Sequence, residues 1–322
     1  MKGEVSMPAS RTIRKNIALV LGAGASMPYG FPSGAKLREI LCALEFVALP
    51  ERILLSQLAT EPRAVAFSRA FRESGIASID EFLERRQDLL DVGRHAIAMV
   101  VGQFEHSARL FSPKTDEGWY DYLWNRICGN SLEDVAQNRL RVITFNYDRS
   151  LEHYLYKAIV NTYNASPSDA LSTLRQIQII HVHGLLGEYR PPDMPDGNGR
   201  PYEPITDAEG LKYAGQSLKL VYERRDDAML SAIHETLEWA KAIYVLGFGF
   251  DSRNCEILNL SRADTSPTQP KFVMATAYQM TEAEIGLARE RLSSRRNAGM
   301  EKASILAFLR LTCFLDKAAE AQ

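Results

Sequence analysis

Paired cysteines are missing from this 322-residue sequence. A zinc ribbon needs two C-x-x-C pairs, and a small disulfide-stabilised domain needs several closely spaced cysteines. The four cysteines present lie far apart and form no such pair: Cys42, Cys128, Cys255 and Cys313. This spacing argues against both architectures, fits a reducing compartment and leads us to expect no metal site.

The sequence also lacks an excess of one charge and a long apolar run. Its 38 basic and 40 acidic residues leave a formal net charge of −2, whereas non-specific nucleic-acid binding needs a basic excess or stripe. The first apolar run, Ile17–Leu21, is much too short for a signal peptide or a membrane span, and residues 1–16 are polar and basic. We therefore expect a cytoplasmic protein with a flexible N-terminus at residues 1–16, no membrane contact and no direct nucleic-acid binding.

Short apolar runs recur along the chain. Continuous runs of this length are typical of strands buried in a parallel sheet, and helical patterns lie near each of them. This alternation predicts an α/β fold: a Rossmann-like parallel sheet with flanking helices. The predicted strands are Ile17–Leu21 and residues 142–145, 177–182, 243–246 and, more weakly, 272–275.

More than a hundred residues between the first two runs have a largely helical pattern. Ser78 and Glu81 form a capping box, in which each side chain bonds the other's backbone N–H at a helix start. A crossover between parallel strands needs only about a dozen residues. We therefore predict one domain over residues 17–322 with a helical module at about residues 45–135, and a long helix at residues 213–240.

The first motif with possible chemistry is Gly22-Ala23-Gly24-Ala25-Ser26, directly after the first predicted strand. Glycines there allow a tight turn and a close approach to a pyrophosphate, with backbone N–H groups pointing at its oxygens. Met27 stands where a G-x-G-x-x-G motif has its third glycine. The alternative is a tight strand-to-helix turn that binds nothing.

The second motif, Thr144-Phe145-Asn146-Tyr147-Asp148, ends the second predicted strand. The carboxyl ends of parallel strands line the ligand crevice of open α/β sheets. Asn146 can donate and accept hydrogen bonds, which suits a ribose hydroxyl or a water molecule. For Asp148 the alternative is a cap on the helix that follows.

Two further motifs also follow apolar runs. His181 and His183 share one face of a strand, and His183 precedes a glycine at its carboxyl end. Because histidine ionises near neutral pH, we take His183 as the catalytic candidate and His181 as a neighbour. The last motif is a second glycine turn, with Asp251 as a plausible helix cap and a purely structural turn as the alternative: Gly247-Phe248-Gly249-Phe250-Asp251.

Taken in order, these motifs resemble the sirtuin superfamily. Three further segments are similar to the bacterial sirtuin-like NAD hydrolases, many of which act in anti-phage defence: Gly30-Phe31-Pro32-Ser33-Gly34, Ile79-Asp80-Glu81-Phe82-Leu83 and Asn146-Tyr147-Asp148. The matches fall within residues 17–276. The resemblance implies a Rossmann-like fold that takes NAD as its substrate.

The resemblance also implies roles for individual residues. Asn146 and His183 would be catalytic, and Asp148 would line the nicotinamide-ribose pocket. Gly22, Ala23, Gly24 and Ser26 would hold the pyrophosphate, with Phe31 and Pro32 in the loop over the cofactor. The adenosine half would face Gly247, Phe248, Gly249, Asp251 and Thr276.

Two departures from the deacetylating sirtuins favour simple NAD cleavage. Those enzymes carry four zinc cysteines, and they have a Gly-x-Pro-Asp-Phe-Arg loop where this chain continues from Pro32 with Ser33 and Gly34. We expect an NAD glycohydrolase that depletes NAD in anti-phage defence. The alternatives are transfer of ADP-ribose to a macromolecule and a non-catalytic NAD-binding scaffold.

Control of such an activity is expected to come from outside the catalytic domain, because an unregulated NAD hydrolase would kill its host. We expect homo-oligomerisation, a separate sensor or activator protein, or both. By family resemblance the partner would be an ATPase or an Argonaute-like protein. The expected contact surfaces are the helical module and residues 303–315.

Overall fold

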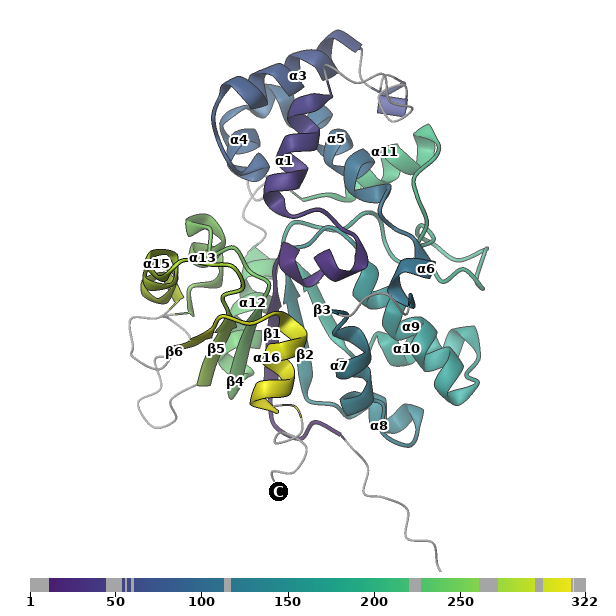
Figure 1. The fold of residues 1–322 in the computed structure, drawn as a ribbon. Coiled ribbons are helices and arrows are strands. Elements are labelled where there is room, and N and C mark those ends of the chain that lie inside the picture. Colours follow the sequence, from purple (N-terminus) through teal and green to yellow (C-terminus); the bar gives the residue numbers. More distant parts are fainter. Residues whose placement is uncertain are drawn as a thin grey trace, which may run out of the picture.

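The computed structural model describes residues 12–44, 54–55, 57–58, 61–112, 117–219, 227–260, 272–292, 298–313 and 315. At its centre is a parallel sheet of six strands in the order β3-β2-β1-β4-β5-β6 (Figure 1). This is the strand order of the Rossmann fold, so the predicted fold class is confirmed. The strands are β1 (Ile17–Leu21), β2 (Leu140–Thr144), β3 (Gln178–His181), β4 (Ala242–Leu246), β5 (Phe272–Thr276) and β6 (Ala298–Glu301).

Five of these strands coincide with the predicted apolar runs, and β6 was missed. The central strand β1 explains the success, because each of its five residues is at most 2% exposed. Leu19 and Leu21 face one hydrophobic core, whereas Ala18 and Val20 face a second core across the sheet. Strand β6 pairs only with β5 at the sheet edge, and its sequence Ala-Gly-Met-Glu contains no apolar run.

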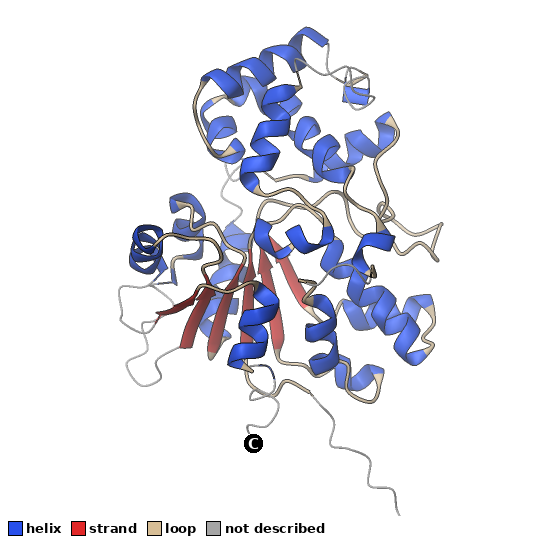
Figure 2. Cartoon of the chain, viewed as in Figure 1, coloured by secondary structure: helices blue, strands red, loops and turns tan. Residues whose placement is uncertain are grey.

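Helices cover both faces of the sheet (Figure 2). The helices on the face of Leu19 and Leu21 are α7 (Tyr120–Ile127), α8 (Leu132–Ala136), α9 (Ser150–Tyr163), α10 (Pro167–Leu174) and α16 (Ile305–Thr312). The opposite face carries α12 (Asp227–Trp239), α13 (Ser252–Leu258) and α15 (Glu282–Leu292). The expected contact segment 303–315 therefore contributes its buried face to the protein's own core, through Phe308 and Leu309.

A cluster of helices lies beyond the carboxyl edge of the sheet (Figure 1). It comprises α1 (Gly34–Ala43), α3 (Glu61–Glu73), α4 (Ile79–Arg85), η3 (Gln87–Leu89), α5 (Leu90–Gly102) and α11 (Ala208–Ser217), all packed around α5. The short helix α6 (Ser107–Leu110) contacts α9 instead. The boundaries 45–135 therefore need correction, because α1 and α11 lie outside them while α7 and α8 lie inside them but pack on the sheet layer.

Two further expectations are corrected. The long helix at residues 213–240 is two helices, since α11 ends at Ser217 and Leu218 is extended and bridges Gly184. Residues 12–16 are anchored rather than flexible: Ile13 is fully buried and Asn16 donates to the carbonyl of Trp239 at 2.8 Å. Residues 1–11 of the predicted N-terminal segment lie outside the described part of the chain.

Candidate functional site

The loops after β1 and β4 pack directly against each other where the strand order reverses. Gly24 N donates to the carbonyl of Gly247 at 2.9 Å, and Gly22 N donates to that of Leu246 at 3.1 Å. A Cβ on Gly22 would lie 2.6 Å from the Gly247 oxygen, and one on Gly247 would lie 2.4 Å from Ala25 N. Gly247 also has a φ of +59°, which L side chains rarely adopt. These glycines are therefore required for contact between the two loops.

Most of the backbone N–H groups expected to hold a pyrophosphate already donate to backbone carbonyls in this region. Besides Gly22 and Gly24, Ala25 N donates to the Gly22 carbonyl and Ser26 N donates to the Ala23 carbonyl. Within the described residues, the Ala23 amide has no protein acceptor in this turn. The turn therefore offers a ligand one backbone donor at Ala23, not the row of donors that the motif predicts.

Next to this turn, a small cavity opens at the carboxyl ends of β1, β2 and β3. The space in it that water can occupy is about 10 Å³, which is room for about one water molecule, and the empty volume of about 220 Å³ includes open solvent at its mouth. The residues around it are Leu21, Ser26, Tyr120, Thr144, Asn146, Asp148, Ser150, Leu151, Glu152, Ile179 and His181.

Three predicted site residues meet in this cavity. Asn146 Nδ2 donates to Ser26 Oγ at 2.9 Å, and Ser26 lies near enough to Asp148 to lower the pKa of that carboxyl. In the bond to Ser26 the amide nitrogen of Asn146 is the donor and the hydroxyl oxygen is the acceptor. This fixes the amide orientation and leaves Asn146 Oδ1 buried, without a hydrogen-bond partner among the described residues. The atom left without a partner is therefore a hydrogen-bond acceptor, Asn146 Oδ1.

Asp148 makes the structural contact that the sequence offered as the alternative, and it also lines the cavity. It accepts from Ser150 N at 3.0 Å at the start of α9, and the Ser150 hydroxyl donates to the same oxygen. It is also buried in the cavity wall. Burial raises the pKa of Asp148 above its ordinary value, while the hydrogen bonds from Ser150 and Ser26 limit the rise.

The sequence analysis did not include Glu152, which contacts His181, the predicted neighbour of the site. His181 Nε2 lies 2.5 Å from Glu152 Oε1, and His181 Nδ1 lies 3.1 Å from the carbonyl oxygen of Asn146. Glu152 lies in the first turn of α9, 29 residues before His181. A search for acidic residues near the histidine in sequence could therefore not find it.

His183 lies beside this cavity and is not among the residues that line it. Its ring packs against Phe145, with centroids 5.5 Å apart, and against Tyr147 at 5.9 Å. These two residues flank Asn146 in the sequence. The His183 side chain is 2% exposed, and neither ring nitrogen has a hydrogen-bond partner in the described part of the chain.

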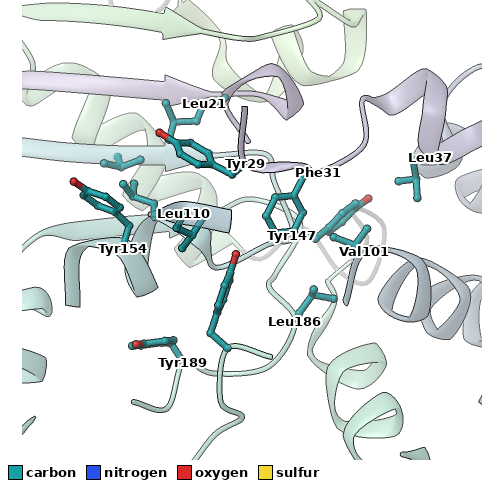
Figure 3. Packing of buried hydrophobic residues seen from close by; sticks show 14 of the residues in the cluster. Leu21, Tyr29, Phe31, Leu37, Val101, Leu110, Tyr147, Tyr154, Leu186 and Tyr189 are labelled. Atoms are coloured by element: carbon teal, nitrogen blue, oxygen red, sulfur yellow. The ribbon is translucent and has the colours of Figure 1, made fainter. Parts of the chain in front are cut away.

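Aromatic residues surround the polar cavity on the side of the helical cluster. The rings of Tyr29 and Tyr120 stack at 3.9 Å, and the Tyr29 hydroxyl accepts from the backbone N–H groups of Trp119 and Tyr120. Phe31 is buried and packs against Phe104, so it belongs to the core (Figure 3). Pro32 is half-buried next to it. The loop expected to cover the cofactor therefore begins as part of the hydrophobic core.

A hydrogen bond connects the helical cluster to the motif that follows β2. The hydroxyl of Tyr147 donates to Asp80 Oδ1 at 2.6 Å, and Asp80 lies in the first turn of α4. Burial and the Asp80 carboxylate raise the pKa of Tyr147 well above its ordinary value. On the same helix Glu84 pairs with Arg253 of α13 at 3.5 Å. Helix α4 is thus bonded to the segment that follows β2 and to helix α13.

The predicted residues after β4 and β5 have structural partners. Thr276 Oγ1 accepts from Gly247 N at 2.9 Å, and Phe248 packs edge-on against Phe145 at 5.1 Å. Asp251 caps α13 by accepting from Arg253 N at 2.9 Å, which is the structural alternative for this motif. Gly249 is exposed, with open space where a Cβ would stand. None of these residues lines the cavity.

A buried ion triad holds the loop at residues 185–204 against the start of α9. Arg149 makes two bonds to Glu105, and the guanidinium of Arg200 also bonds Glu105. Arg149 Nη1 additionally donates to the carbonyl of Arg200 at 2.6 Å. Because Arg149 follows Asp148 directly, the triad anchors the backbone that presents this carboxylate.

Comparison with known proteins returns no match to a family model, and none of the curated proteins matches significantly. Among the residues that the structure describes, no group of three or more His, Cys, Asp or Glu side chains could hold a metal ion. No helix within the described ranges is long and apolar enough to cross a bilayer.

Proposed function

We propose that this protein cleaves NAD into nicotinamide and ADP-ribose. One observation carries the proposal: Ser26, Asn146 and Asp148, from motifs 120 residues apart, line one cavity beside the switch point of a Rossmann-ordered sheet, with Asn146 bonded to Ser26. In such sheets the ligand crevice lies at this place. The sirtuin-like motif order supplies the identity of the ligand.

The proposed reaction breaks the bond between C1′ of the ribose and the nicotinamide nitrogen. Its electron pair passes to the positively charged nicotinamide ring, which leaves as a neutral molecule, and C1′ develops oxocarbenium character. Water then bonds to C1′ and releases a proton. A site for this reaction need not supply a strong nucleophile, but it must hold the ribose and the water in line.

The free acceptor Asn146 Oδ1 suits the holding role, because a ribose hydroxyl and a water molecule are both donors to it. The Asp148 carboxylate lines the same cavity and favours positive charge developing nearby. For His183, the two unpartnered ring nitrogens suit a general base, since an imidazole engaged at both nitrogens could not take a proton.

The test is release of nicotinamide and ADP-ribose from NAD by the purified full-length chain. Asn146→Ala and His183→Ala should each abolish release while circular dichroism and the unfolding midpoint stay close to wild type. Matched controls are Asn161→Ala, on the exposed side of α9, and His234→Ala, on α12 across the sheet. Full activity in both site variants would refute the assignment.

The assay also addresses control and product. We propose that a partner protein or self-association activates the enzyme in anti-phage defence, a role that the motif resemblance alone suggests. NAD cleavage is therefore measured with and without the products of neighbouring genes. Free ADP-ribose supports hydrolysis, a mass increment on a macromolecule supports transfer, and binding without turnover supports a scaffold.

A further inference from the structure

The imidazole of His181 is held at both of its nitrogens. Nδ1 faces the carbonyl oxygen of Asn146 at 3.1 Å, and Nε2 faces the carboxylate of Glu152 at 2.5 Å. A carbonyl oxygen and a carboxylate oxygen only accept hydrogen bonds. Both contacts are satisfied together when each ring nitrogen carries a hydrogen, so the geometry selects the imidazolium form.

The surroundings of His181 also favour its charge. The side chains of His181 and Glu152 are 7% and 11% exposed. Burial lowers the pKa of His181, but the Glu152 carboxylate, the Asn146 carbonyl and the Asp148 carboxylate raise it above its ordinary value. The other polar residues around the cavity are neutral hydroxyls from four separate segments: Ser26, Tyr120, Thr144 and Ser150. Arg149, a cation near Glu152, is paired with Glu105.

We propose that His181 and Glu152 are positioning residues that hold the Asn146 peptide, and with it the Asn146 side chain, in place only while His181 is protonated. This consequence for catalysis rests on the proposed NAD cleavage. A neutral imidazole has one N–H. If that N–H stays on Nδ1, a lone pair faces the Glu152 carboxylate; if it moves to Nε2, the Asn146 carbonyl loses its donor. Both contacts are therefore present at low pH, and one of the two is lost as pH rises through the pKa of His181.

The first test needs no activity. In the full-length chain, NMR follows the ring signals of His181, assigned with His181→Gln, and the side-chain amide signals of Asn146. We expect both sets to titrate with one midpoint above the ordinary histidine value. Glu152→Gln keeps an acceptor for Nε2–H but removes the charge, and should lower that midpoint by about 1–3 pH units.

The control Glu133→Gln removes the same charge from the exposed start of α8 and should leave the midpoint unchanged. The proposal is overturned if the Asn146 signals do not follow His181, or if Glu152→Gln leaves the midpoint of His181 where it was.

The second test is the pH profile of NAD cleavage. Glu152→Gln should move the alkaline limb of the wild-type profile to lower pH by the shift measured for His181, and Glu133→Gln should not. If Glu152→Gln cleaves NAD and the alkaline limb of its pH profile is where it is in the wild type, the positioning role is ruled out. Absence of cleavage in the wild type at every pH, alone and with the products of neighbouring genes, refutes the proposed function instead, while the NMR titration still decides the contact.

Discussion

Replacement of Gly247 by alanine tests the contact between the loops after β1 and β4. The new Cβ would lie 2.4 Å from Ala25 N and 2.5 Å from the Gly24 carbonyl carbon, which are backbone atoms that no rotamer change can move away. Overpacking of this kind costs about 1–3 kcal/mol. The φ of +59° at Gly247 adds about 1–2 kcal/mol for a residue with a Cβ. Gly247→Ala should therefore lower the free energy of unfolding by about 2–5 kcal/mol.

Gly249, two residues further in the same loop, is the matched control. Its Cβ would meet nothing within 4 Å and its φ is not in the left-handed region, so Gly249→Ala should change stability by less than about 0.5 kcal/mol. Urea unfolding of the two variants and the wild type, followed by circular dichroism, gives the comparison. Equal stability of Gly247→Ala and Gly249→Ala would refute the packing argument.

Two further predictions concern the contacts that hold the site. Glu105→Gln leaves Arg149 and Arg200 buried without their carboxylate and should lower the free energy of unfolding by about 3–5 kcal/mol in chemical denaturation. The control Glu39→Gln, in an exposed pair, should lower it by less than about 1 kcal/mol. Equal losses would contradict the role of the triad. Tyr147→Phe and Asp80→Ala should each destabilise the fold, and a double-mutant cycle should give a coupling energy of about 1 kcal/mol because the two side chains share one hydrogen bond. Strictly additive effects would show that this bond does not contribute to stability.

Local patterns in the sequence were sufficient for much of the sheet and for some helix starts. Strand β1 is buried on both faces, so every one of its residues is apolar and the run is visible without knowledge of its neighbours. The helix start at Ser78 is likewise local: Ser78 Oγ accepts from Glu81 N at 3.4 Å, which is half of the predicted capping box, while the Glu81 carboxylate pairs with Arg85. Strand β6 was not predicted, because this edge strand of four residues has no continuous apolar run.

The helix boundaries show where local patterns stop being sufficient. Residues 213–240 have helical composition, but Leu218 leaves the helix to pair with Gly184, a partner 34 residues earlier in the chain. The N-terminal segment that was expected to be flexible is a second case in which a distant partner decides the structure. Polar and basic residues 12–16 are held because Ile13 N donates to Asn138 Oδ1 at 2.8 Å, a contact across 125 residues.

The short apolar runs, the helical patterns near them and the motifs at strand ends are properties of the sequence by itself. They determined the α/β class, five of the six strands and the candidates Ser26, Asn146 and Asp148, because each signal is contained in a few consecutive residues. Only the tertiary structure decided which candidates meet. It brought Asn146, Ser26 and Asp148 to one cavity, gave His181 its partner Glu152, and tied Thr276 and Asp251 to structural contacts. Those outcomes depend on strand order and on side-chain contacts between segments distant in the sequence, which no local pattern encodes.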